Sequence, residues 1–314
     1  YKRQLATQSI VYVFVTTACY WHFTRWRPTL QINFAPIKEM FGFSGKLLVT
    51  NVFNHINNNL FSVILGKFYS EQEVGYYSQA NKWCSMGQQF ISGMINGVAQ
   101  PVLTKVSDDL ERQRRVFRKM LRFTAFISFP AMLGLGIISE ELITITITDK
   151  WYSSVSIMQI LCISGAFIPV SNLYQQLIIS KGKSRIYMWN TITLGIILMA
   201  GVLLVHSHGI YAMLAIYVSI NILWLLTWHY FVQREIGLQL RQALADILPY
   251  AIIAATVMAV SYYSTRFVEN IYIRLPSKIM LAAALYIAAM WASRSVTFKE
   301  SIAYFIKKKA DGHE

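Results

Sequence analysis

The chain has 314 residues, of which 55% are hydrophobic and only 14% are charged, and its mean hydropathy is +0.40. An average soluble domain carries about 25% charged residues, so the composition excludes a soluble globular protein. A net charge of +14 is typical of nucleic-acid-binding proteins, but here the basic residues follow a topological pattern that gives them another explanation.

Nine stretches of the chain are long and apolar enough to be transmembrane helices, since a bilayer core about 30 Å thick needs roughly 20 residues per helix. The predicted spans cover residues 7–24, 44–66, 83–104, 120–143, 155–178, 187–205, 209–231, 247–264 and 277–293. A membrane β-barrel would instead show segments of about 10 residues with strict alternation, which the sequence lacks. The predicted fold class is therefore an all-α integral membrane protein with about nine spans.

Most of the 29 lysines and arginines fall in loops on one side of these spans, with a dense cluster from Lys105 to Arg122. Because basic loops stay in the cytoplasm, the N-terminus is predicted outside and the C-terminus inside. The cluster is expected to form a solvated helix against anionic lipid head groups. The first residue is not Met and no signal peptide is visible, which predicts that the natural protein begins further upstream.

Two consecutive predicted spans carry polar side chains at helical spacing. The stripes are Asn51, His55, Asn58 and Ser62 in the second span, and Ser85, Gln89, Ser92, Asn96 and Gln100 in the third. Lipid-facing helix does not tolerate such a density of polar groups. The stripes therefore predict one wall of a water-filled substrate cavity, although hydrogen bonding between packed helices is the alternative.

A third polar cluster follows Pro169 in the fifth span and comprises Ser171, Asn172, Gln175 and Gln176. Pro130 interrupts the fourth span in the same way. Because proline removes a backbone donor and kinks a helix, Pro130 and Pro169 are candidate hinges. The chain has no P-loop, GxSxG, HExxH or CxxC motif, and its three cysteines form no recognisable metal set. We therefore expect no enzyme activity, no metal and no cofactor.

Several short motifs resemble a known family when taken in order. They are Arg27-Pro28-x-Leu30, Glu39-Met40-Phe41-x-Phe43-Ser44, Leu65-Gly66, Val74-Gly75-Tyr76-Tyr77-Ser78-x-Ala80, Pro101-Val102-Leu103, Asp149-Lys150-Trp151 and Ser180-Lys181-Gly182-Lys183. Their order and spacing resemble the polysaccharide transporters of Wzx type, in the branch of the colanic acid and teichuronic acid exporters. That family belongs to the multidrug/oligosaccharidyl-lipid/polysaccharide exporter superfamily.

The resemblance covers nearly the whole chain and implies the C-terminal part of a MATE-like transporter with two helical bundles. Residues 1–43 would hold the last helix of the N-terminal bundle and an inner linker, and residues 44–231 a six-helix C-terminal bundle. Residues 232–293 would add two transmembrane helices, and residues 294–314 a cytoplasmic tail. The N-terminal bundle itself would lie upstream.

The implied function is that of a flippase, which moves undecaprenyl-diphosphate-linked oligosaccharides across the cytoplasmic membrane by alternating access for surface polysaccharide export. The implied partners are membrane lipid, the polyprenyl-diphosphate-linked glycan, the polysaccharide polymerase and other assembly proteins, with no nucleic acid. Relatives keep cations in the cavity, whereas no cation lies deep in a predicted span here. Candidate diphosphate contacts at the rim are Lys46, Lys67, Lys82 and Arg122.

Two alternatives remain open from the sequence. A cation-coupled multidrug exporter of the same superfamily would need a carboxylate inside the membrane. None is evident in the sequence, and the deepest carboxylates are Glu140 and Glu141. A non-transporting membrane scaffold of the glycan assembly complex would use the polar stripes only to join helices.

Overall fold

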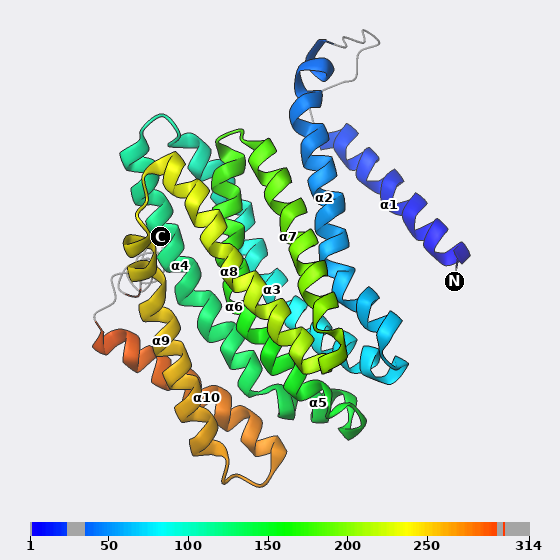
Figure 1. The fold of residues 1–314 in the computed structure, drawn as a ribbon, viewed down its shortest axis with the longest axis vertical. Coiled ribbons are helices and arrows are strands. Elements are labelled where there is room, and N and C mark those ends of the chain that lie inside the picture. Colours follow the sequence, from blue (N-terminus) through cyan, green and yellow to red (C-terminus); the bar gives the residue numbers. More distant parts are fainter. Residues whose placement is uncertain (1, 24–34, 294–297, 299–314) are drawn as a thin grey trace. The chain divides into compact units, whose positions relative to one another are not determined.

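The computed structural model describes residues 2–23, 35–293 and 298 (Figure 1). Within these residues the chain is helical and has no β-strand. The α-helices are α1 (Lys2–Phe23), α2 (Ala35–Phe68), α3 (Glu71–Lys105), α4 (Leu110–Ile137), α5 (Ser139–Ile147), α6 (Ser154–Ser180), α7 (Ser184–Leu204), α8 (Ile210–Ile236), α9 (Leu240–Thr265) and α10 (Ile271–Ala292). Residues 24–34 of the predicted linker and nearly all of the predicted tail lie outside this description.

Six helices, α4 and α6 to α10, are long and apolar enough to cross a membrane. Such segments are stable in lipid as helices because a helix satisfies its own backbone hydrogen bonds. The predicted all-α membrane fold is therefore confirmed, and the protein is a multi-pass membrane protein. Asparagine and glutamine side chains lower the hydropathy of α2 and α3, and for α1, α2 and α3 the predicted spans stay a prediction.

Several helices begin well before the predicted spans, because hydropathy marks the apolar part of a helix and not its polar ends. Helix α4 starts at Leu110, after Asp109 caps it by accepting a hydrogen bond from the Arg112 amide at 2.9 Å. The helix predicted in this basic segment is therefore the first part of α4, and its contact with lipid head groups stays a prediction. The predicted fourth span also crosses the break at Ile138 between α4 and α5.

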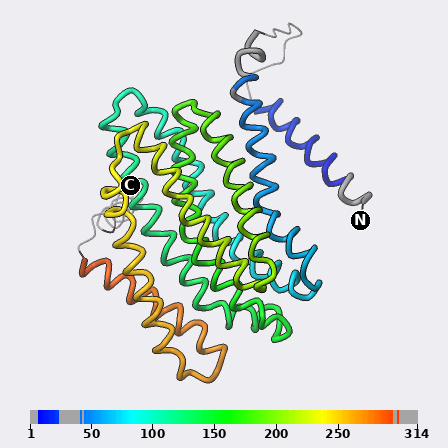
Figure 2. The backbone as a smooth tube through the Cα atoms, in the orientation of Figure 1, coloured from blue at the N-terminus to red at the C-terminus, as the bar shows by residue number. Residues whose placement is uncertain are grey.

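The chain divides into two compact units, residues 1–45 and 46–314. In the second unit α6 is the central helix and packs against α3, α4 and α8 (Figure 2). Its most apolar stretch is 61% buried, against 22–39% for the other five candidate spans. The segments that contact α6 are thus placed around one axis, which positions their polar faces relative to one another.

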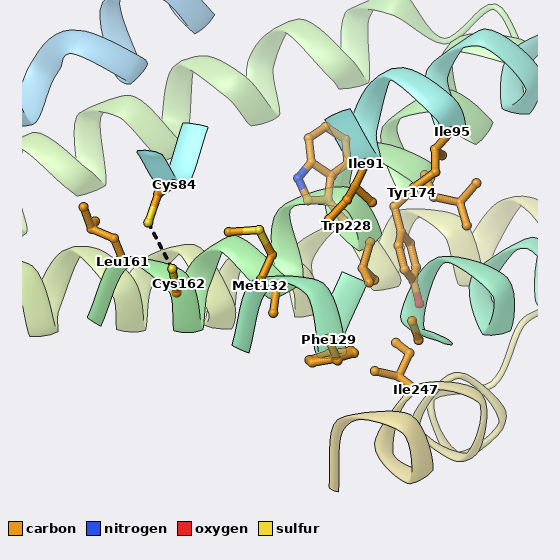
Figure 3. Close-up of a cluster of buried hydrophobic side chains, with 14 of the residues drawn as sticks. Cys84, Ile91, Ile95, Phe129, Met132, Leu161, Cys162, Tyr174, Trp228 and Ile247 are labelled. Carbon is orange, nitrogen blue, oxygen red and sulfur yellow. Dashed lines mark hydrogen bonds between the residues drawn. The ribbon is translucent and has the colours of Figure 1, made fainter. Parts of the chain in front are cut away.

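Tightly packed side chains from α3, α4, α6, α8 and α9 form the core of the second unit (Figure 3). Cys84 and Cys162 are both buried free thiols, and their sulfur atoms lie 3.1 Å apart. At Gly165 on α6, an added Cβ would lie 2.6 Å from Cε of Met132 and 2.8 Å from Nε2 of Gln88. The α6 backbone can approach its neighbours this closely because the residue has no side chain.

Ion pairs join the α9–α10 pair to the rest of the second unit at both ends. Near the start of α9, Asp246 accepts hydrogen bonds from Arg118 at 2.6 Å and Arg122 at 3.1 Å. Near the start of α10, the Glu141 carboxylate lies 2.5 Å from the Lys278 ammonium and 2.7 Å from Arg274 Nε. Lys278 is only 2% exposed, so a cation is buried inside the protein at the start of a predicted span, and its depth in the membrane stays a prediction. The helix containing it begins six residues before the predicted span.

Candidate functional site

A cavity of about 600 Å³ lies in the second unit between α2, α3, α6, α7 and α8. Most of its lining consists of amide and hydroxyl side chains: Asn54, Asn57, Asn58, Asn59, Asn81, Ser85, Gln88, Gln89, Ser92, Asn96, Ser164, Ser171, Asn172, Gln175, Gln176 and Asn221. Five aromatic residues, Phe167, Tyr187, Tyr217, Trp224 and Trp228, also line it. No described residue of the lining is charged, and its volume is in the range of small-ligand sites.

The polar face of α3 forms one side of the cavity. Four residues of its predicted stripe, Ser85, Gln89, Ser92 and Asn96, line the cavity, together with Asn81 and Gln88. Gln100 is exposed and does not line it. Because Gln100 lies one turn beyond Asn96, the cavity ends before this part of α3.

The polar face of α2 is rotated relative to the prediction. Asn58 lines the cavity, but the structure does not place Asn51, His55 or Ser62 there. The buried face of α2 follows Asn57, Phe61 and Leu65 at four-residue steps, and Asn51 and His55 are exposed on another side. The large apolar residues Phe61 and Leu65 determine which face packs inward, whereas the prediction used polar residues alone.

The polar cluster on α6 also faces the cavity, since Ser171, Asn172, Gln175 and Gln176 all line it. On α8 the lining residues Tyr217, Asn221, Trp224 and Trp228 follow the same i, i+4, i+7, i+11 spacing as the predicted stripes. This stripe was missed because three of its four members are aromatic and read as apolar in a hydropathy scan. The spacing around Asn221 was the available signal.

Some polar side chains of the cavity hydrogen bond between helices. Asn172 donates to the Ser92 hydroxyl at 3.0 Å, and Gln176 donates to the Asn96 carbonyl oxygen at 3.2 Å, so α6 and α3 are joined twice. Asn57 donates to the main-chain oxygen of Thr191 on α7 at 3.0 Å. These contacts are the interhelical bonding that the alternative interpretation requires.

Other amides at the cavity have no such partner. In the described part of the chain, five of these amide side chains form no hydrogen bond with another residue: Asn58, Asn81, Gln88, Gln89 and Gln175. Asn58, Gln89 and Asn96 are exposed, so the cavity is open along α2 and α3. Helix packing therefore accounts for part of the polar lining, and the remaining amides are available to water or to a ligand.

The four rim cations are not gathered at the cavity. Lys46, Lys67, Lys82 and Arg122 are absent from its described lining. Arg122 pairs with Asp246 on α9, and the Lys67 ammonium lies 5.6 Å from the centre of the Phe68 ring. Lys82 directly follows the lining residue Asn81 on α3, and it is the candidate with the shortest path to the cavity along the chain.

The two candidate hinge prolines lie inside continuous helices, Pro130 in α4 and Pro169 in α6. Proline has no N–H for the carbonyl four residues earlier, which leaves the Phe126 oxygen without its helical donor. The Tyr286 hydroxyl of α10 donates to this oxygen at 2.9 Å. Ser128 similarly donates to the Ala166 oxygen, three residues before Pro169, at 2.6 Å. Another helix thus satisfies the carbonyl that Pro130 frees, whereas the Ser128 bond goes to the residue after Gly165, whose carbonyl Pro169 frees. Hinge motion stays a prediction.

Residues 4–156 match the model of a family described as polysaccharide biosynthesis protein. The lipopolysaccharide biosynthesis protein WzxC of Escherichia coli (strain K12) is 28% identical over 171 residues, which are 54% of this chain and 35% of that protein. The teichuronic acid biosynthesis protein TuaB of Bacillus subtilis (strain 168) is 24% identical over 278 residues, 85% of this chain and 57% of that protein. The predicted likeness to Wzx-type polysaccharide transporters is confirmed.

The chain also resembles a solved structure in its fold. The solved structure of the lipid II flippase MurJ in its inward closed conformation matches with a TM-score of 0.64 over 89% of this chain and 58% of that one, at 15% identity. At this identity the match shows the fold alone. The chain spans between 35% and 57% of the length of these two curated relatives.

Proposed function

We propose that this chain is part of a flippase that moves undecaprenyl-diphosphate-linked oligosaccharides across the cytoplasmic membrane for surface polysaccharide export. The observation that carries the proposal is the polar cavity, lined from the middle of α3, α6 and α8 and flanked on α3 by exposed apolar residues such as Phe90 and Met94. Polar groups at membrane depth are costly and mark substrate pathways. The names of the curated relatives and the fold of a lipid II flippase support the same activity.

In the proposed mechanism the hydrophilic glycan occupies the cavity, while the polyprenyl tail stays in lipid beside the open side along α2 and α3. Alternating access would then expose the cavity to each side of the membrane in turn, with Pro130 and Pro169 as the sites where α4 and α6 bend. The C-terminus would be cytoplasmic, as the positive-inside tendency predicts. The chain would act as a transporter and not as an enzyme.

The drug-exporter alternative needs a carboxylate that is free to bind a coupling cation. The two buried carboxylates in the described residues, Glu141 and Asp246, are each paired with two cationic side chains. A charge already compensated in this way has little electrostatic drive to bind another cation. The scaffold alternative would leave no reason for Asn58, Gln89 and Gln175 to lack protein partners.

A cell-surface export assay tests the proposal. Replacing Asn58, Gln89 and Gln175 together by leucine removes three unpartnered amides without removing an interhelical hydrogen bond. We expect surface polysaccharide to be lost while the amount of protein in the membrane is unchanged. The matched control is Asn51→Leu, an exposed asparagine of α2 outside the cavity, which should export normally. Normal export by the triple variant would refute the cavity as the route.

A further inference from the structure

The described cavity lining offers both hydrogen-bond donors and acceptors and no charge. We infer that this cavity binds the uncharged, hydroxyl-bearing sugar rings of the glycan and excludes the diphosphate. The inference rests on the proposed function and narrows it to one chemical part of the substrate. Four observations on amides, buried polar atoms, aromatic residues and cations support it.

The unpartnered amides match a hydroxyl group better than they match an anion. Each Asn or Gln side chain carries two N–H donors and a carbonyl acceptor, and a sugar hydroxyl also donates and accepts. A diphosphate or carboxylate only accepts, so each amide oxygen facing it would be repelled. Anion sites in proteins use arginine, lysine or backbone N–H groups for this reason. Asn58, Gln88, Gln89 and Gln175 therefore favour hydroxyls.

Two buried polar atoms of the lining lack a partner among the described residues. They are the Gln176 carbonyl oxygen and the Trp224 indole nitrogen, one an acceptor and the other a donor. Gln176 uses its N–H in the bond to Asn96, which leaves its oxygen directed to a different group. Buried polar atoms are nearly always hydrogen-bonded, so this pair points to a partner that itself both donates and accepts.

Trp224 and Tyr217 supply the apolar surface that a sugar ring also needs. A pyranose ring has apolar C–H faces, and aromatic rings present flat apolar surfaces with a polar group at one end. Tyr217 is held by Phe61 of α2, with ring centroids 5.2 Å apart. Trp228 is only 2% exposed, and the centroid of its ring lies 6.1 Å from that of Tyr187. It therefore packs inside the protein beneath the exposed part of the lining. Trp224 is partly exposed and is the residue we assign to the sugar.

The cations that could hold a diphosphate lie elsewhere. Carboxylates of α5 and α9 engage the ammonium and guanidinium groups of Lys278, Arg274, Arg118 and Arg122. Lys82 is the cation next to the lining in sequence, and it is exposed. The sugar and the diphosphate would thus be bound by different parts of the transporter.

Binding to the purified protein in lipid nanodiscs tests the inference directly. The probes are a neutral pentasaccharide, a pentasaccharide of uronic acids, and inorganic diphosphate, each followed by calorimetry and tryptophan fluorescence. We expect the neutral probe to bind and to resist competition by an equal concentration of diphosphate. Trp224→Leu and Gln175→Leu should each weaken binding of the neutral probe about tenfold. Trp291→Leu, an exposed tryptophan of α10 outside the cavity, should have no effect.

The opposite results would overturn the inference. One such result is that diphosphate or the uronic probe binds more tightly than the neutral probe. The other is that Trp224→Leu and Trp291→Leu have equal effects on binding of the neutral probe. Gln89→Glu keeps the side-chain size and therefore controls for misfolding. It should weaken binding of the uronic probe at least as much as binding of the neutral probe. If the neutral probe fails to bind while the triple leucine variant still abolishes export, the inference falls and the proposed function stands. If export survives in that variant, the proposed function falls.

Discussion

Tyr286 compensates for the loss of a backbone hydrogen bond at Pro130. The Phe126 oxygen lacks its helical donor because proline has no N–H, and the Tyr286 hydroxyl takes the place of that donor from α10. In lipid no water can satisfy a carbonyl released in this way. A single hydroxyl on α10 therefore satisfies the carbonyl that Pro130 frees in α4.

Tyr286→Phe should lower the free energy of unfolding by about 1–2 kcal/mol, because it leaves the Phe126 carbonyl unsatisfied while removing no apolar surface. Reversible unfolding in mixed micelles measures the change. Tyr272→Phe on the same helix is the matched control, since Tyr272 is exposed, and should change stability by less than about 0.5 kcal/mol. Equal effects of the two substitutions would show that the Tyr286 hydroxyl does not stabilise α4 at Pro130.

Gly195 allows α7 to approach the cavity-lining Asn57. A Cβ at this position would lie 2.1 Å from the Asn57 Oδ1 atom and 2.9 Å from its Cγ atom. The amide would have to move, and its bond to the Thr191 oxygen would be strained or lost.

Gly195→Ala should therefore cost about 1–3 kcal/mol of stability through overpacking, measured by the same unfolding assay. Gly97→Ala on α3 is its control, because no heavy atom lies within 4 Å of the added Cβ there. Since alanine favours helix over glycine, the control should be neutral or stabilising. A harmless Gly195→Ala would contradict the close approach of α2 and α7.

Helices α9 and α10 are attached by ion pairs that no sequence pattern announced. The Glu141 carboxylate is fully buried, 0% exposed, and breaking such a pair leaves an uncompensated charge in a low-dielectric region. Lys278 also donates to the Ile137 oxygen at 3.0 Å, which fixes α10 against the end of α4.

Glu141→Leu should destabilise the protein by about 3–5 kcal/mol, because the Lys278 ammonium loses its partner. The double substitution Glu141→Leu with Lys278→Met should recover a large part of this loss, since it removes the stranded charge as well. A double-mutant cycle in the unfolding assay gives the coupling between them. Additive effects would mean that the two groups do not act as a pair.

Apolar length and polar spacing predicted the helices better than they predicted how the helices face each other. On α3 the structure places Ser85, Gln89, Ser92 and Asn96 of the predicted stripe at the cavity and leaves Gln100 outside it. On α2 large apolar residues lie beside the polar ones, and only packing decides which face turns inward. The ion pairs of Asp246 and Glu141 join residues more than a hundred positions apart, and their partners are therefore invisible to local patterns.

The second unit combines an apolar exterior with a polar interior space, which is the reverse of a soluble protein. Exposed apolar residues such as Phe90 and Met94 lie on α3 next to the cavity-lining Gln89. This arrangement is what a transporter needs: lipid contacts one side of the helix and water the other. The family resemblance and the fold agree with it, and both were predicted from the sequence.

Water access along α3 tests this account most directly. Single cysteines at Ser85, Gln89 and Asn96 should react rapidly with a membrane-impermeant maleimide in intact vesicles, because these positions line an open polar cavity. Cysteines at Met86, Phe90 and Met94, which are exposed apolar positions on the same helix, should react slowly because they face lipid. Equal or reversed reactivity of the two sets would contradict a water-filled substrate cavity.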